Sequence, residues 1–235
     1  YSDKVDFSKN TIVYEVKSKA LYEKVPFVLG MMEEIMYNTR FDDYKRLKEI
    51  IARIKSRLEA SLMGQGHSIA MLECCAQFSE SAYYSDILRG YKYYEFIKKL
   101  DEEFEQNKTQ IVDKLNKLVG YIFNKDNVIV SLTADDEGYD CFVKALSAKS
   151  CNIKDEHYNT AVRSFIPVNV KTGYTSASQV QYVARCGNFV KDGYKYTGAL
   201  KVLKVIFSYD YLWINVRVKG GAYGCMSGSS RNGDF

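Results

Sequence analysis

Proline, histidine and tryptophan are scarce in this sequence, which has 235 residues but only two Pro, two His and one Trp. Because proline interrupts helices, its scarcity favours long uninterrupted helices. The two histidines, His67 and His157, lie far apart and in unlike surroundings, and neither an H-E-x-x-H nor an H-x-x-E-H pattern occurs. We therefore expect no metal site within this chain, a capping or packing role for His67, and a solvated His157.

Long apolar runs, basic stripes and paired cysteine motifs are also missing. No window approaches the roughly 18 consecutive apolar residues of a membrane-spanning helix, so we expect no membrane association. The net charge is +4 and the charges are interspersed, which argues against nucleic-acid binding. None of the six cysteines, at 74, 75, 141, 151, 186 and 225, forms C-x-x-C. Reduced thiols in a cytoplasmic protein fit best, with an organellar matrix as the alternative if a targeting segment has been removed.

Both ends of the sequence lead us to expect a piece of a longer protein. Tyr1 is preceded by no start Met, and no signal sequence follows it. Near the other end, Asn232-Gly233 predicts a hairpin turn, but the sequence stops at Phe235 before a returning strand.

Apolar residues three and four apart predict most of the helices. The clearest helix is expected to be capped by Asp42 and to bury Tyr44, Leu47, Ile51, Ile54, Leu58 and Leu62. Others are expected over 26–37, 67–78, from Gly90 to 122, 135–148 and 194–218. Asp135, Asp136 and Glu137 could form a metal-binding or acid–base cluster, but their position at a helix start favours capping.

Segments rich in β-branched and aromatic residues predict strands over 11–18, 127–133, 161–170, 180–186 and 222–229. Their order among the helices predicts an α+β fold of mainly antiparallel sheets, with helices packed on one face. The polar residues 151–160 are expected to form a linker between a domain at 1–150 and another at 161–235.

Arg217 and Tyr223 flank the pair Gly220-Gly221, just after the last predicted helix. The glycines give the backbone freedom, the guanidinium donates from a fixed fork, and the phenol donates from a rigid ring. This pair suits a peptide carbonyl, or the oxyanion formed when water attacks it. An ordinary helix C-cap explains the same residues, and spacing alone favours that cap.

The surrounding sequence resembles a known family in order and spacing. The stretches 179–188, 193–203 and 211–224 are similar to the C-terminal half of the pitrilysin/insulinase zinc metallopeptidases, and most similar to the presequence-protease branch. Residues 41–50, 66–70 and 90–94 resemble the third domain of that branch. The resemblance covers nearly the whole chain and is strongest between Arg217 and Tyr223.

The resemblance implies an architecture of four homologous α+β domains in two halves that close like a clamshell. Residues 1–150 would then be the C-terminal part of the third processing-peptidase-like (metallohydrolase-like) domain. Residues 161–235 would be the N-terminal part of the fourth, truncated at Phe235. In this family the N-terminal half holds zinc through H-x-x-E-H and a distal Glu. This chain would hold no metal and would pair with its own zinc-bearing N-terminal half.

The resemblance also implies site roles in an endopeptidase that degrades unstructured oligopeptides in a closed chamber. Tyr223 would hydrogen-bond the scissile carbonyl or its oxyanion, and Arg217 would hold substrate backbone or orient Tyr223, with Gly220 and Gly221 as substrate-binding positions. Alone, the chain would be inactive. The alternative is a catalytically dead binding or scaffold subunit, like the non-catalytic partners of processing peptidases, although such a subunit needs neither Arg217 nor Tyr223.

Overall fold

The computed structural model describes residues 12–148, 165–175 and 179–235. Within these ranges the chain divides into two compact units. The first unit contains Ile12, residues 54–99 and residues 165–235. The second unit contains residues 13–53 and 100–148. Each unit is described by itself below.

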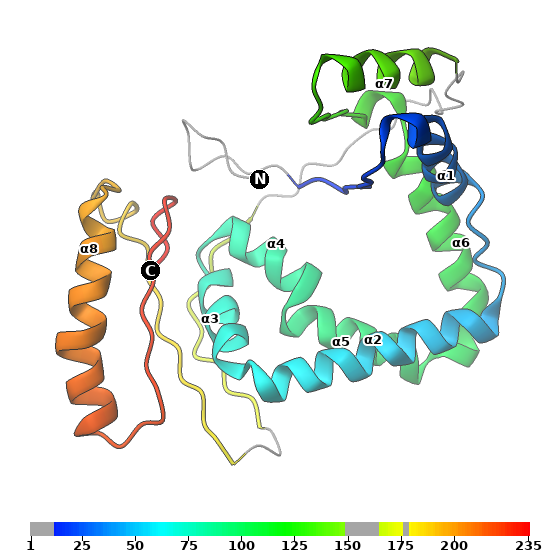
Figure 1. Cartoon of the computed structure of the whole chain (residues 1–235). Coiled ribbons are helices and arrows are strands. Elements are labelled where there is room, and N and C mark those ends of the chain that lie inside the picture. Colours follow the sequence, from blue (N-terminus) through cyan, green and yellow to red (C-terminus); the bar gives the residue numbers. More distant parts are fainter. Residues whose placement is uncertain (1–11, 149–164, 176–178) are drawn as a thin grey trace. The chain divides into compact units, whose positions relative to one another are not determined.

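The described elements are helical and are coloured along the chain in Figure 1. In the N-terminal part they are η1 (Tyr22–Lys24), α1 (Val25–Tyr37), α2 (Tyr44–Gly64), α3 (Gly66–Ala76), α4 (Glu80–Arg89) and α5 (Tyr91–Glu102). They continue with α6 (Phe104–Ile122), η2 (Lys125–Asn127), α7 (Asp136–Ala148), α8 (Ala199–Ile206) and η3 (Phe207–Val218). The last of these is a π-helix that continues α8 without a break.

Most of the predicted helices are confirmed, with local corrections. Pro26 lies in the first turn of α1, where its missing N–H costs nothing. The cap of α2 is Asp43, whose Oδ1 accepts from Arg46 N at 2.9 Å, whereas the expected Asp42 pairs with Arg40. The predicted long helix after Gly90 is two helices that part at Glu103, and α4 was not predicted.

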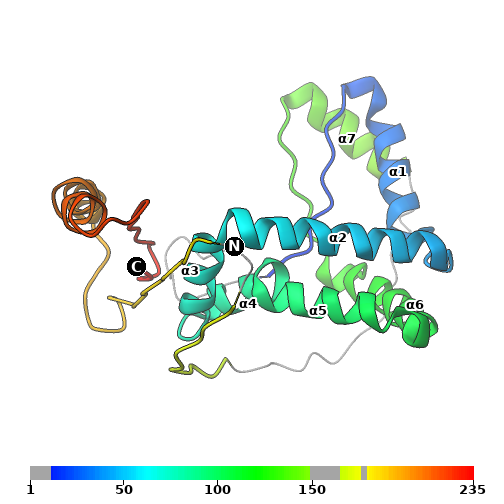
Figure 2. The same cartoon turned by 90° about the horizontal axis from the view of Figure 1, so that it is seen from below.

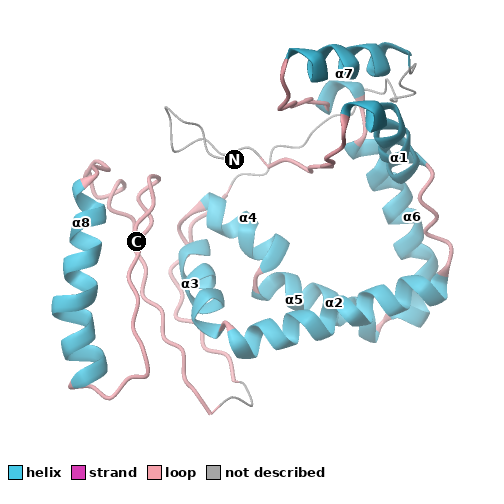
Figure 3. Ribbon diagram, in the orientation of Figure 1, coloured by secondary structure: helices cyan, strands magenta, loops and turns pink. Residues whose placement is uncertain are grey.

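The predicted antiparallel sheets are absent from the described residues, which form helices joined by extended or irregular segments (Figure 3). Within those ranges, the β-bridge whose two residues are both described joins Asn188 and Asp234. The expected strand at 161–170 is described from residue 165. There Val168 N donates to Gln77 O at 2.7 Å, and Val170 N donates to Gln77 Oε1 at 2.8 Å. Gln77 caps α3, so these bonds join an extended segment to a helix end.

The prediction of an α+β fold with mainly antiparallel sheets is therefore wrong for this structure. The described parts of the other expected strands, at 11–18, 127–133, 180–186 and 222–229, likewise belong to no ladder. The reason is that β-branched residues favour extended backbone, but a strand also needs bonding partners along a neighbouring strand.

In the first unit, α3 packs against α4, and the C-terminal part of α2 runs beside α5 (Figures 1 and 2). Tyr94 of α5 donates its hydroxyl to Glu59 of α2 at 3.3 Å. The buried apolar side chains of this unit are Ala76, Ala82 and Ile97. A fully buried carboxylate, Asp86, lies in the same unit at 0% exposure.

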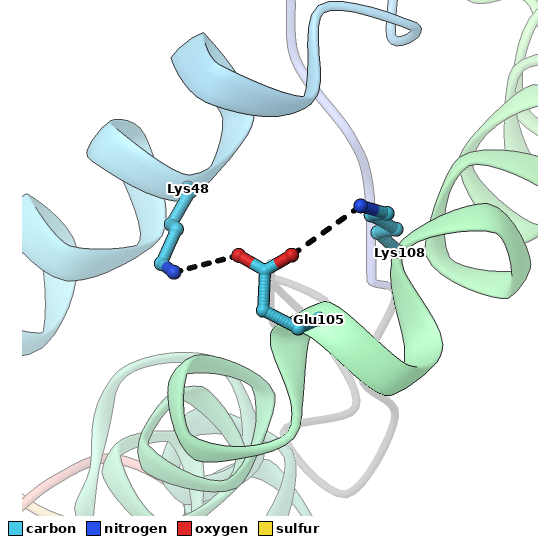
Figure 4. Close-up of polar contacts among 3 residues, drawn as sticks. All are labelled: Lys48, Glu105 and Lys108. Carbon is cyan, nitrogen blue, oxygen red and sulfur yellow. Dashed lines mark hydrogen bonds and ion pairs between the residues drawn. The ribbon is translucent and has the colours of Figure 1, made fainter.

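In the second unit, α1 packs against α7, and Phe104 at the start of α6 is buried. The Tyr37 and Phe123 rings meet edge to face with centroids 5.9 Å apart. Figure 4 shows Glu105 between two lysines, with Lys48 Nζ of α2 at 2.7 Å and Lys108 Nζ of α6 at 3.3 Å. These cations lower the pKa of Glu105. All three side chains are exposed, so these ion pairs add little to the stability of the fold. The Lys48–Glu105 pair serves mainly to orient α2 relative to α6.

The predicted division of the chain at 151–160 stays a prediction, because this linker lies outside the described residues. No helix within the described ranges is both long enough and apolar enough to cross a membrane.

Candidate functional site

The candidate site lies at the end of the helix formed by α8 and η3. Helix was predicted over 194–218 and is found over 199–218. The π-helical half ends with Lys219 N donating to Ile214 O at 2.9 Å, five residues back. Such stretches are rare and often lie at functional sites.

Gly220 and Gly221 close this helix with a glycine cap. Gly221 N donates to Arg217 O at 3.0 Å, and Ala222 N donates to Val216 O at 3.2 Å. Each bond reaches one residue further back than in a Schellman cap, as expected after a π-helix. Gly221 has φ +72°, and a Cβ on Gly220 would lie 2.6 Å from Val216 O. Both glycines are therefore required by the backbone, whatever they do for a substrate.

Arg217 and Tyr223 lie on either side of this cap. The Arg217 guanidinium carbon lies 4.0 Å from the Trp213 ring centroid, one turn back, in a cation–π contact. Tyr223 is 93% exposed, the highest value among the large hydrophobic and aromatic residues described. No hydrogen bond joins the two side chains within the described part of the chain. The cap thus offers a restrained guanidinium and a freely exposed phenol, and their roles stay predictions.

The histidines and the acidic triplet do not build a site in the described ranges. His67 lies near the Tyr182 ring, with centroids 6.1 Å apart, which agrees with a packing role. His157 lies outside the described residues. Asp135 Oδ1 accepts from Gly138 N at 2.9 Å and so caps α7, as predicted. Across the described ranges, no three His, Cys, Asp or Glu side chains are placed to hold a metal ion.

A buried carboxyl pair, which the sequence reading missed, connects α3 and α4 in the first unit. Glu73 is 8% exposed and Asp86 is 0% exposed. Asp86 Oδ2 lies 3.0 Å from Lys92 Nζ, its cationic partner. Burial and a hydrogen bond with Asp86 raise the pKa of Glu73. Glu73 therefore holds its proton to a higher pH than a free glutamate side chain does. A lone Glu inside the otherwise apolar run Ala70–Ala76 was the signal that could have revealed it.

Three cysteines of the first unit form a second unpredicted group. Cys74 and Cys75 are neighbours on α3, and Cys186 comes from an extended segment more than 100 residues later. Cys186 Sγ donates to Met71 O of α3 at 3.6 Å, one helical turn before Cys75. The hydrogen bond from Cys186 lowers the pKa of Cys75, whereas the contact with Cys75 and burial raise the pKa of Cys186.

Curated proteins similar to this chain include a bacterial protein and organellar proteases. Protein HypA of Clostridium perfringens is 37% identical over 224 residues, covering 93% of this chain and 22% of that protein. Presequence protease 1, chloroplastic/mitochondrial, of Arabidopsis thaliana is 26% identical, covering 89% of this chain and 19% of that protein. The mitochondrial presequence protease of Drosophila melanogaster is 27% identical, covering 94% and 21% respectively.

Two family models match separate parts of the chain. Residues 1–100 match the model for the region associated with subfamily C of the M16 peptidases, and residues 173–235 match the model described as PreP C-terminal domain. This chain belongs to the presequence-protease-like M16 peptidases. Arg217, Tyr223 and the glycine pair all lie within the second matched region of this M16 peptidase chain.

The resemblance to the presequence-protease branch is therefore confirmed. The M16 chain nevertheless spans only about a fifth of the length of the curated relatives it matches. Their names consequently describe proteins much longer than this chain.

Proposed function

We propose that this chain is the substrate-gripping, metal-free part of a zinc-dependent endopeptidase that degrades unstructured oligopeptides in a closed chamber. The observation that carries the proposal is the cap at Gly220-Gly221. It holds Arg217 against Trp213 and leaves Tyr223 almost wholly in solvent. A phenol that only packed against the fold would bury its ring.

The zinc implied by the family finds no ligand set among the described residues. We therefore assign the zinc ion to the N-terminal half of the same protein, outside this chain. On this proposal the 235 residues alone cleave nothing. The compartment stays open between cytoplasm and organellar matrix, because the similar proteins include bacterial as well as mitochondrial and chloroplastic ones.

Tyr223 is proposed to donate its hydroxyl proton, in a hydrogen bond, to the scissile carbonyl oxygen. The bond strengthens as that oxygen gains negative charge, so it favours the transition state over bound substrate. Arg217 is proposed to donate to substrate backbone carbonyls. The stack on Trp213 limits its rotamers, so less entropy is lost when a peptide binds.

The test replaces Tyr223 with Phe in the full-length protein. Removing one such donor lowers kcat by about 100- to 1,000-fold in comparable sites, and we expect a loss of that order. Peptide turnover is measured together with zinc content, which is expected to be unchanged. Tyr194→Phe is the matched control, because Tyr194 is also exposed, at 69%, and lies in the segment that precedes α8, away from the glycine cap.

Equal kcat in Tyr223→Phe and wild type would assign Tyr223 a structural role. A wild-type full-length protein that bears no H-x-x-E-H upstream of this chain, and no peptidase activity, would instead support the binding or scaffold subunit.

A further inference from the structure

The glycine cap belongs to a long excursion of the chain that is closed at its base. Asn188 and Asp234, 46 positions apart in sequence, form the β-bridge noted above. Beside this bridge, Gly187 N donates to Phe235 O at 3.0 Å, and Phe235 N donates to Gly187 O at 3.1 Å. Residues 189–233, called the excursion below, therefore begin and end at one place in the first unit.

Within the excursion, the helix formed by α8 and η3 leads outward and residues 222–229 lead back. Figure 1 shows the returning segment in red beside the orange helix. The hydroxyls of Ser208 in η3 and Ser227 in the returning segment share a hydrogen bond at 3.1 Å, which joins the two part-way along. The Gly220-Gly221 cap lies where the chain reverses. Its position consequently depends on how the base is held.

The Asp234 carboxylate is the centre of the base. Its Oδ1 accepts from Asn188 Nδ2 at 2.8 Å, and its Oδ2 accepts from Asn232 Nδ2 at 2.7 Å. These two amides belong to the base itself. Hydrogen bonds to an ionised acceptor are about twice as strong as neutral ones, so the carboxylate holds both sides of the base together.

The same carboxylate fastens the base to α4. Ser79 Oγ donates to Asp234 Oδ2 at 2.7 Å, and the Ser79 residue is only 6% exposed. Ser79 is the N-cap residue of α4, a position where a serine hydroxyl usually bonds an amide of the helix. Within the described α4 it makes no such bond. The hydroxyl is thus committed to Asp234 and not to its own helix.

Two further contacts reach the same corner between α3 and α4. Lys191 Nζ donates to Phe78 O at 2.5 Å, and Asn232 Nδ2 donates to Ser81 Oγ at 3.3 Å. The corner lies in the first region matched by a family model, and the base lies in the second. The excursion is therefore attached to the helical part of the first unit through its base.

We propose that Asp234 is a positioning residue for the peptidase function: its carboxylate closes the base of the excursion, fastens it to α4, and so places Arg217 and Tyr223 for a bound peptide. This inference rests on the function proposed above. Two carboxylate oxygens accept all three donors. An asparagine of the same shape would turn an NH2 group toward at least one of them and leave that donor unpaired.

The first measurement follows hydrogen exchange in the 235-residue chain and needs no activity. Gly187 N and Phe189 N donate across the base, to Phe235 O and Gly233 O. In Asp234→Asn we expect both amides to exchange at least about tenfold faster, because the base opens locally. Unchanged exchange in α5 shows that the first unit is still folded. Asp210→Asn, which alters an exposed Asp of η3 in the same excursion, is the matched control and should exchange as wild type does.

The second measurement is peptide turnover by the full-length protein. A misplaced grip weakens both substrate binding and transition-state binding, so Asp234→Asn is expected to raise KM, lower kcat, and reduce kcat/KM by about tenfold or more. A change that merely unfolds part of the sample lowers the apparent kcat and leaves KM unchanged. Ser79→Ala should have a smaller effect in the same direction. The double variant should be no worse than Asp234→Asn, because both changes remove the same bond.

The positioning role is overturned if Asp234→Asn keeps wild-type exchange at Gly187 and Phe189, or if its KM equals that of wild type. Such a result, together with a loss of turnover in Tyr223→Phe, would leave the proposed function standing. Wild-type turnover in Tyr223→Phe with a raised KM in Asp234→Asn would instead remove the role of Tyr223 and support the positioning role. A full-length protein without peptidase activity would overturn both.

Discussion

Glu73 and Asp86 bury two carboxyl groups next to each other with a single cation, Lys92, and the hydroxyl of Tyr174 close by. Burial is the largest cause of the raised pKa of Glu73, followed by the hydrogen bond and the charge of Asp86. Burying a second negative charge beside the first is costly, so Glu73 holds its proton to a higher pH in the folded state than in the unfolded chain. Burial first, and then the charges of Glu73 and Glu95, raise the pKa of Tyr174.

This pair predicts a fall in stability with rising pH. A carboxyl whose pKa is higher in the folded than in the unfolded state stabilises the fold fully at a pH below its unfolded pKa. This stabilisation is lost as the pH rises through its folded pKa. Glu73→Gln keeps the donor but cannot ionise, so we expect its free energy of unfolding to lack this decline. Urea titrations from about pH 4 to neutral measure it. The exposed Glu23→Gln is the control, and identical profiles for Glu73→Gln and wild type would contradict the assignment.

The sequence identified Arg217, Tyr223 and the glycines because they stand in a short contiguous stretch. Their arrangement around a cap follows from glycine chemistry that sequence displays directly. Glu73 was visible as a lone Glu in an apolar run, but its partner Asp86 was not predictable, nor was the contact of Cys186 with Met71, because these residues meet through tertiary packing. Periodicity places a residue on a helix face, but it does not say which side chain from another segment meets it there.

At the scale of the element, Gly90 is the junction on which α4 and α5 depend. It directly follows α4 and precedes α5, with no residue between. A Cβ at this position would lie 2.8 Å from the Cα of Asp86 and would also strike the Asp86 carboxylate. Backbone atoms cannot move aside as a flexible side chain can, so the junction accepts only glycine without rearrangement.

Gly90→Ala is therefore expected to destabilise the chain by about 1–3 kcal/mol, the usual cost of overpacking a buried position. Gly64→Ala is the matched control. Gly64 ends α2, has a negative φ, and an added Cβ would meet nothing within 4 Å. Alanine there should be neutral or stabilising by up to about 1 kcal/mol. Thermal or urea unfolding measures both, and equal effects of the two variants would refute the steric explanation.

Helices were predictable from the sequence and strands were not, for one physical reason. A helix satisfies its backbone hydrogen bonds within one segment, so a local pattern such as Leu47, Ile51 and Ile54 is enough to indicate it. A strand such as 165–170 depends on another segment for the same bonds. In the described structure, residues 165–170 donate hydrogen bonds to Gln77 at the end of α3. Within the described ranges no neighbouring strand lies beside them, so the extended backbone forms no ladder.

For the molecule as a whole, burial is unevenly distributed. Helix α6 buries Phe104, Ile111, Val112 and Gly120, whereas α8 and η3 bury no residue. Many of their apolar side chains are at least 38% exposed: Val202, Leu203, Val205, Ile206, Phe207, Trp213, Ile214, Val216 and Val218. The described chain thus contains one helix whose apolar side chains remain largely in water.

This difference predicts uneven protection from hydrogen exchange in the isolated chain. Local opening is easiest where few apolar contacts are lost, so we expect α8 and η3 amides to exchange at least about tenfold faster than those of α6. Mass spectrometry of peptic peptides over a time course measures the ratio. Comparable protection in both helices would mean that α8 and η3 are packed in solution, contrary to their described exposure.

The exposed ring of Tyr223 has a practical consequence. A phenol in open water absorbs and fluoresces as the free amino acid does, and a fluorine or nitro group on its ring senses only solvent. Anything that settles over the Gly220-Gly221 turn, a peptide or another part of a longer protein, would change that environment at once. Position 223 therefore offers an optical or magnetic probe that could time the closing of the proposed chamber without a measurement of catalysis.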